Sequence, residues 1–265
     1  MLRDITIGQY YQTDSIIHRL DPRVKLGGTL LYIITLFLIG NVWGYLLATL
    51  ALWAVIKLSK VPFQFIIRGM HSIGFLLAIT VVFNMFLTPG EAIFQLWIFK
   101  LTKEGLRTAL FMGWRLCLLI IGSSLMTLTT TPNNLTDGME KALKPFNKIG
   151  IPVHEISMMM SISLRFIPIL LEETDKIMKA QIARGADFES GNLIQKAKAM
   201  VPLLVPLFVS AFRRANDLAM AMESRCYRGG EGRTKMKPLI YQKEDKLGYV
   251  CMLLVLAVTI FVGRL

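Results

Sequence analysis

Charged residues are scarce in this sequence, and their scarcity excludes most classes of soluble protein. Asp, Glu, Lys and Arg make up 18% of the 265 residues, whereas hydrophobic residues make up 54% and come in long blocks. Such blocks are typical of an integral membrane protein. The net charge of +12 raises nucleic acid as an alternative partner, but no basic groove with interleaved aromatic residues is visible. Orientation in the lipid bilayer and an acidic partner surface explain the positive charge better.

The residues of common catalytic and metal sites are missing as well. No GxxxxGK[ST] loop is present, and the nearest candidate, residues 229–235, does not match it. The three cysteines form no CxxC pair and the three histidines are isolated, so neither a disulfide framework nor a zinc site is supported. There is no GxSxG elbow and no pair of intramembrane carboxylates. We therefore expect this chain to carry out no catalysis and to hold no metal or cofactor.

Hydrophobic segments predict about five membrane spans, of which the first two are close to the minimum length for a crossing. The spans cover residues 24–40, 43–58, 69–87, 106–128 and 247–262. Lys and Arg gather beside the ends assigned to the cytosol, which predicts a cytosolic N-terminus and, after five crossings, an extracellular C-terminus. The expected fold is all-α: a multi-pass protein of the cell membrane with a cytosolic region of amphipathic helices.

Arg115 is the one cation well inside a predicted span. About ten residues into a helix, it would lie roughly 15 Å deep. A charge at that depth is costly, so Arg115 either faces other helices or a polar cavity, or it reaches the surface from a helix that begins later. The sequence leaves both alternatives open.

Charge also divides the chain into domains. We predict a membrane domain at residues 1–128 with four spans, a cytosolic domain at 129–245 with most of the charge, and a last span at 246–265. The polar run at 129–135 predicts a helix stop followed by a new N-cap.

Two apolar stretches of the cytosolic domain, residues 156–164 and 199–212, are not predicted to cross the membrane. Arg165 and Pro168 interrupt the first, while Pro202 and Pro206 lie inside the second. We expect helices that lie along the inner membrane surface or pack beneath the membrane bundle instead.

Two short basic tips are the candidate functional sites: Ala183-Arg184-Gly185 and Ser224-Arg225-Cys226. Apolar periodicity predicts one helix over residues 166–184 and another over 207–225, so each would end in an arginine. A cation in the last turn is favoured by the helix dipole by roughly 0.3–1 kcal/mol, and for one helix that effect suffices as an explanation. The pairing of two such ends in one domain favours a functional role.

The tips belong to a wider set of motifs that resembles the transmembrane T component of energy-coupling factor (ECF) transporters, a class of ABC importers. The matching stretches cover nearly the whole chain: 18–25, 129–135, LRFIP at 164–168, QIARGADF at 181–188, PLLVPL at 202–207, RRA at 213–215 and AMESRCY at 221–227. The most specific part of the resemblance is a pair of Ala-Arg-Gly motifs. The first motif is intact, whereas Ser224 and Cys226 replace alanine and glycine in the second.

The resemblance implies a division of labour within a prokaryotic membrane complex. Two cytosolic ABC ATPase subunits, which hold ATP and Mg, would each receive one tip. Arg184 would enter a groove of one ATPase and Arg225 a groove of the other, with Ala183, Gly185 and Ser224 small enough for close approach. The chain would relay their movement to a membrane substrate-binding subunit, the S component, for uptake of a vitamin or metal ion.

Methionines indicate where the S component could bind. Met158, Met159 and Met160 supply flexible side chains suited to a surface that accepts several shapes, although any one of them could simply face lipid or a neighbouring helix.

Two other functions remain compatible with the sequence. A self-sufficient permease or secondary transporter predicts transport without ATPase subunits. A membrane assembly scaffold predicts ATPases that bind but whose hydrolysis moves no solute.

Overall fold

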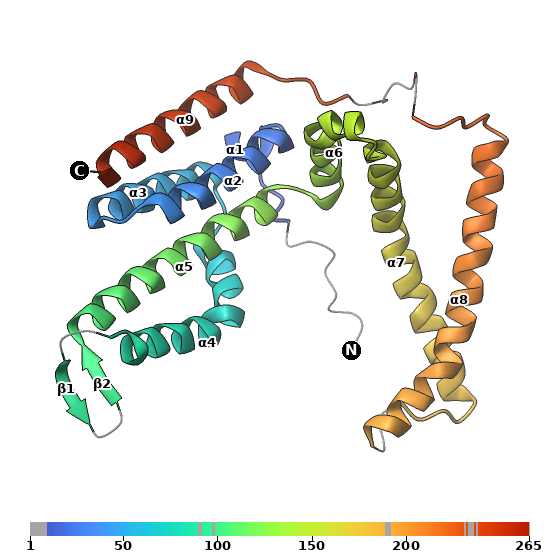
Figure 1. Ribbon diagram of the computed structural model, residues 1–265. Helices are drawn as coiled ribbons and strands as arrows, with labels where there is room; N and C mark the ends of the chain where they lie inside the picture. The colour runs from blue at the N-terminus through green and yellow to red at the C-terminus, as the bar shows by residue number, and fades with distance from the viewer. Residues whose placement is uncertain are drawn as a thin grey trace. The chain divides into compact units, whose positions relative to one another are not determined.

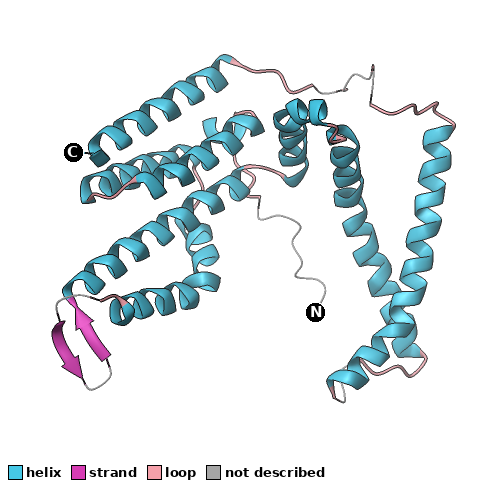
Figure 2. Ribbon diagram, viewed as in Figure 1, coloured by secondary structure: helices cyan, strands magenta, loops and turns pink. Residues whose placement is uncertain are grey.

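The computed structural model describes residues 10–89, 92–96, 99–188, 192–230, 232, 236 and 238–264. Two compact units are present. The described residues of the bundle unit lie within 8–138 and 239–265, and those of the long-helix unit lie within 139–238. Figure 2 shows that helices form nearly all of the regular structure. The predicted all-α fold class is confirmed, with one small β-hairpin as an addition.

The elements of the bundle unit are α1 (Ile16–Arg19), α2 (Pro22–Leu38), α3 (Val42–Ser59), α4 (Phe63–Leu87), β1 (Ala92–Leu96), β2 (Phe99–Thr102), α5 (Lys103–Thr129) and α9 (Lys243–Arg264). Side-chain caps fix where two of the helices begin. The Asp21 carboxylate accepts the Arg23 N–H at 2.9 Å, and Thr102 Oγ1 accepts the Gly105 N–H at 3.0 Å. The two strands pair antiparallel, with Leu96 opposite Phe99.

Helix α6 (Pro132–Leu143) passes from the bundle unit into the long-helix unit. The polar run at 129–135 therefore does separate two helices, as predicted. The long-helix unit continues with the 3-10 helix η2 (Lys144–Ile149), α7 (Val153–Ala183) and α8 (Leu193–Glu223). The domain boundaries at 128/129 and 245/246 stay a prediction.

Among the described residues, four helices are long and apolar enough to cross a membrane: α3, α5, α7 and residues 243–262 of α9. Three of the predicted spans, 43–58, 106–128 and 247–262, lie within such helices. The predicted span 24–40 corresponds to α2, which has 17 residues. The predicted span 69–87 lies in α4, whose apolar stretch is 73–86. Several helices of this length and composition are the signature of a multi-pass membrane protein. Helix α7 is among them although residues 156–164 were not predicted to cross, and its position relative to the membrane stays a prediction.

Helix α7 corrects one prediction from the sequence. The break expected at Arg165 and Pro168 is wrong, because α7 continues through both residues for 31 residues in total. A proline inside a helix removes one backbone hydrogen bond and strains the preceding turn, which flanking helical turns can tolerate. The same correction applies to α8, which contains Pro202 and Pro206 and begins at Leu193 rather than near residue 207.

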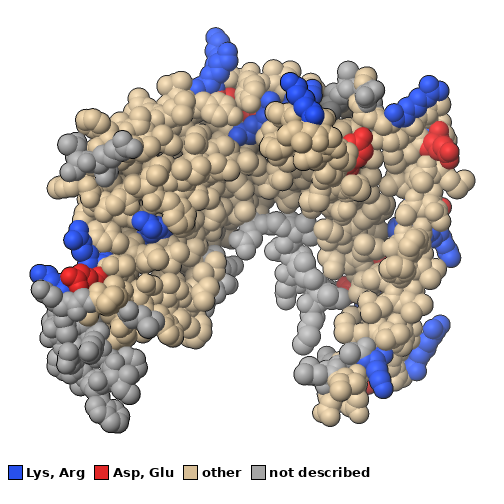
Figure 3. Space-filling view, viewed as in Figure 1, with Lys and Arg blue, Asp and Glu red and all other residues tan. Residues whose placement is uncertain are grey.

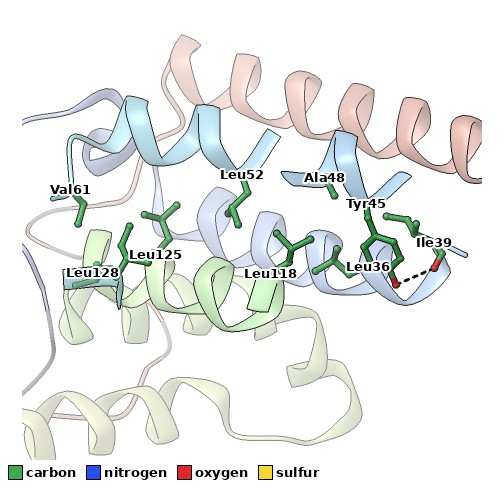
Figure 4. Packing of buried hydrophobic residues seen from close by; sticks show 10 residues of the cluster. Leu36, Ile39, Tyr45, Ala48, Leu52, Val61, Leu118, Leu125 and Leu128 are labelled. Atoms are coloured by element: carbon green, nitrogen blue, oxygen red, sulfur yellow. Dashed lines mark hydrogen bonds between the residues drawn. The ribbon is translucent and has the colours of Figure 1, made fainter. Parts of the chain in front are cut away.

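The core of the bundle unit lies between α2, α3 and α5 (Figure 4). Leu36, Tyr45, Ala48 and Leu118 are among the side chains that pack together there, each with at most 3% of its surface exposed. The opposite faces of these helices carry large exposed apolar side chains such as Phe37 and Trp43. Figure 3 shows that the visible face of this unit is largely uncharged, as expected of a surface that meets lipid.

A buried polar network ties the start of α2 to the start of α9. The Asp245 carboxylate, with 3% of the residue exposed, accepts the Asp21 N–H at 2.7 Å and the Gln242 N–H at 2.8 Å. Asp21 in turn forms an ion pair with Arg23 at 2.8 Å, and the Arg23 guanidinium lies 3.7 Å from the centre of the Tyr241 ring. These contacts give residues 18–25, one of the matching stretches, a structural role.

Arg115 faces other helices, which decides between the two alternatives that the sequence left open. Its Nε donates to the Tyr45 hydroxyl at 2.7 Å and its Nη2 donates to the Ile39 carbonyl at 3.3 Å. Ile39 is the C-cap of α2, and its carbonyl, which has no partner within the helix, accepts from the Tyr45 hydroxyl at 3.3 Å as well as from Arg115. The guanidinium also lines a cavity of about 380 Å³ together with Arg107 and Thr108.

Replacing Arg115 tests this capping role. Arg115→Met keeps the length of the side chain but removes both hydrogen bonds, so we expect it to lower the free energy of unfolding by about 1–3 kcal/mol. Arg107→Met is the matched control, because Arg107 is exposed and lines the same cavity. Thermal unfolding in detergent measures both variants. Equal melting temperatures for the two variants would contradict the capping role.

Candidate functional site

The long-helix unit is built on two antiparallel helices, α7 and α8, each of 31 residues (Figure 1). Arg214 of α8 donates to the Glu173 carboxylate of α7 at 3.1 Å. Nearer to the start of α7 and the end of α8, apolar side chains of both helices line a groove of about 300 Å³. The groove residues include Phe166 and Leu170 of α7 and Ala215 and Ala219 of α8. Ala215 and Ala219 are exposed, so the groove is open along this side of α8.

A second polar contact between the two helices compensates for a proline. Pro206 has no N–H, so the carbonyl of Pro202, four residues earlier, has no partner inside α8. Gln181 of α7 supplies one, since its Nε2 donates to that carbonyl at 3.2 Å. The contact holds α8 against the last turn of α7, three residues before Arg184.

The first tip ends α7 in a Schellman motif. Ala183 is the last helical residue and Arg184 is the C-cap. Gly185 follows with φ +88°, its N–H donates to the Ile182 carbonyl at 2.9 Å, and the Ala186 N–H donates to the Gln181 carbonyl at 3.0 Å. Open space surrounds the Cα of Gly185. The glycine is therefore needed for its left-handed backbone rather than for lack of room.

The second tip has the same backbone geometry, although its sequence differs. Cys226 takes the left-handed position with φ +55°, and its N–H donates to the Glu223 carbonyl at 2.9 Å. The Tyr227 N–H donates to the Met222 carbonyl at 3.1 Å. Arg225 thus stands directly before a left-handed residue, as Arg184 does. The departure of Ser224 and Cys226 from the Ala-Arg-Gly pattern leaves the shape of the helix end unchanged.

Both arginines are exposed, and so are the small residues beside them, Ala183, Gly185 and Ser224. Within the part of the chain that the structure describes, no hydrogen bond or ion pair holds the guanidinium of Arg184 or Arg225. Because α7 and α8 are antiparallel, their C-terminal ends lie at opposite ends of the pair. From the Pro202 level to Arg225, a helical rise of 1.5 Å per residue gives a separation of about 35–40 Å. The structure keeps the two tips apart.

The three consecutive methionines lie near the start of α7. Met159 and Met160 are exposed by 56% and 50%, whereas Met158 is half-buried. Two of the three residues therefore present free apolar surface, which a partner helix or lipid could cover.

Some residues that shape this unit carry no motif in the sequence. They are Gln181, the Glu173–Arg214 ion pair, and a small cluster of Glu140, His154 and Ser157 at the corner between α6 and α7. Their partners are 14 to 41 residues apart in the chain, so no local pattern could have identified them. No group of metal-ligating side chains is found in the described ranges.

Comparison with known proteins connects this geometry to a family. A family model described as cobalt transport protein, CbiQ, matches residues 13–236. A protein named energy-coupling factor transporter transmembrane protein EcfT from Clostridium kluyveri is 55% identical over 262 residues, which are 98% of this chain and 97% of the relative. The EcfT of Bacillus subtilis is 48% identical over 265 residues, covering 100% of both chains. The EcfT of Lactococcus lactis is 47% identical over 254 residues, covering 96% of each.

The fold and the matches together define a multi-pass subunit of a membrane transporter. More specifically, the chain belongs to the EcfT family, the transmembrane proteins of energy-coupling factor transporters. The resemblance inferred from the motifs is confirmed, and a T component is one part of a multi-subunit complex.

The left-handed residue of the second tip gives a test of the site geometry. A non-glycine residue with positive φ is strained, so we expect Cys226→Gly to stabilise the end of α8 by up to about 1 kcal/mol. Cys226→Ala is the control, since it removes the sulfur but keeps the strain. Gly185→Ala should destabilise the first tip by a similar amount. Hydrogen exchange at the amides of residues 226 and 227 reports the second tip, and equal protection in the glycine and alanine variants would argue against this geometry.

Proposed function

We propose that this protein is the coupling subunit of an ECF-type importer that takes up a vitamin or metal ion. In this proposal the chain itself is not an enzyme. ATP and Mg bind in two cytosolic ABC ATPase subunits, and the transported solute binds in a membrane S component. The observation that carries the proposal is the pair of equivalent helix ends, each with one exposed arginine, at opposite ends of an antiparallel helix pair.

Each tip has the properties of a docking point for a separate protein. An arginine with no partner in the described chain can form a paired, desolvated contact with a carboxylate in a groove of an ATPase. The small residues on either side allow the groove walls to approach the backbone. Because the tips are about 35–40 Å apart, one tip is available to each of two ATPase subunits.

The long helices explain how a movement at the tips could reach the membrane. A packed helix transmits displacement over its length, whereas a loop would absorb it. The Glu173–Arg214 and Gln181–Pro202 contacts keep α7 and α8 moving together. The exposed Met159 and Met160, with the half-buried Met158, form the proposed contact surface for the S component.

The proposed orientation follows from the cations. The N-terminus and the tips lie on the cytosolic side, where the ATPases are, and the C-terminus lies outside. Labelling of single cysteines at positions 183 and 226 from the two sides of the membrane tests the shared location of the tips.

Charge reversal tests docking. We expect Arg184→Glu or Arg225→Glu to weaken ATPase binding by about 2–5 kcal/mol, because a buried pair becomes a pair of like charges. Copurification of the ATPases and uptake in proteoliposomes measure the effect. Arg228→Glu is the control, since Arg228 is exposed and follows Arg225 by three residues.

Each possible result has a clear meaning. Loss of copurification and uptake only in the tip variants supports the proposal. Unchanged binding and uptake in the double variant would show that the tips are not the docking points. Uptake by the chain without ATPases would instead indicate a self-sufficient permease, and ATPase binding with hydrolysis but without uptake would indicate an assembly scaffold.

A further inference from the structure

A cluster of polar side chains connects α6 and α7 at the corner between the two helices. His154 Nδ1 donates to Glu140 Oε1 at 2.9 Å, and Ser157 Oγ donates to Glu140 Oε2 at 3.0 Å. The Glu140 side chain is 16% exposed and that of His154 is 28% exposed. Both carboxylate oxygens are thus used to fix α7 against α6, and the imidazole ring is held in one orientation.

The backbone that follows the second tip rests on this imidazole. A methyl group added at Gly230 would overlap the His154 ring, lying 2.7 Å from its Cγ. The φ of Gly230 is not positive, so the position requires glycine for space alone. His154 Nε2 is buried and has no hydrogen-bond partner among the described residues. The contact with Gly230 is therefore one of packing against the covered ring.

The contact between Gly230 and His154 restrains the chain that follows the second tip. Arg225 precedes Gly230 by five residues, a stretch that spans at most about 17 Å when fully extended. Near the start of this stretch, the Tyr227 N–H donates to the Met222 carbonyl in α8. At its end, Gly230 packs against the ring of His154 in the first turn of α7. The second tip is thereby tied to both long helices.

The first tip has an equivalent tie. Gln181, three residues before Arg184, donates to the Pro202 carbonyl of α8. Each arginine therefore lies close to a contact with the helix that does not carry it. Arg184 of α7 is near the Gln181–Pro202 contact with α8, and Arg225 after α8 is near the Gly230–His154 contact with α7.

We propose that His154 is a positioning residue for the second tip: Glu140, itself held by Ser157, orients the His154 ring, and the ring packs against Gly230 and so fixes the direction in which Arg225 is presented. The consequence for ATPase docking rests on the proposed function. The positioning itself does not, because it concerns only contacts within this chain.

Local mobility of the tip tests the positioning. Cys226 is exposed and can carry a spin label in the full-length protein once Cys117 and Cys251 are replaced by serine. We expect His154→Ala and Gly230→Ala to make a label at Cys226 more mobile. A label at an introduced Ala183→Cys, with Cys226→Ser, should be unaffected. Arg228→Ala is the control for the segment, and His154→Phe, which keeps a ring but loses the Glu140 contact, should have a smaller effect than His154→Ala.

The mobilities of the two labels are compared. Greater mobility of the label at position 226, with no change at position 183, supports the proposal. Unchanged mobility at position 226, or equal loosening at both positions, would overturn it, the latter because it would mean general destabilisation of the unit.

Binding of the purified ATPase pair then tests the consequence by double-mutant cycles. We expect the single variant His154→Ala to weaken ATPase binding about fivefold. The same substitution should weaken binding no further in a chain that already carries Arg225→Ala, and should have its full effect in a chain that carries Arg184→Ala. Equal additivity in both backgrounds would contradict action through Arg225. If neither arginine variant weakens binding, the proposed function fails while the mobility result still stands on its own.

Discussion

The separation of the two tips depends on α8 remaining one unbroken helix through Pro202 and Pro206. Two prolines within five residues would normally bend or end a helix. Here the Pro202 carbonyl, which has no helical partner because Pro206 lacks an N–H, accepts a hydrogen bond from Gln181 of α7. A bond between the two helices thus replaces the one missing within α8. A break at this point would let Arg225 swing relative to Arg184, and the pair would no longer present its cations at a fixed distance.

The two tips show that backbone geometry, rather than residue identity, defines the motif. Gly185 adopts the left-handed conformation without cost, whereas Cys226 adopts it at some cost in strain. The hydrogen-bond patterns of the two ends are otherwise identical. Strain retained at Cys226 indicates that the surrounding contacts determine its conformation. The Tyr227–Met222 bond and the Gly230–His154 contact are two such contacts in the structure.

The bundle unit shows how a small membrane domain stabilises its polar groups. Arg115 satisfies the Ile39 carbonyl at the end of α2, and Lys25 Nζ donates to the carbonyls of His18 and Thr129, which lie at the ends of α1 and α5. In both cases a cation binds backbone oxygens that helix ends leave without partners. Burial, with a contribution from the charge of Lys25, lowers the pKa of His18 below its usual range.

Much of this architecture could be predicted from the sequence, because it depends on local patterns. Apolar blocks located the helices, the polar run before Leu135 located the break between α5 and α6, and the two arginines located the candidate site. The length of α8 could not be predicted, because the residue that compensates Pro206 lies 25 positions away in Gln181. His154 looked isolated for the same reason: its partner Glu140 and its neighbour Gly230 belong to other segments.

The distance between the two tips tests the central claim most directly. Spin labels at positions 183 and 226, in a chain without the other two cysteines, can be measured by pulsed electron resonance in detergent and in the complex with ATPases. A rigid antiparallel pair predicts one narrow distribution centred at about 40 Å. A broad distribution, or a distance below roughly 20 Å, would show that the two arginines are not held apart by a continuous α8.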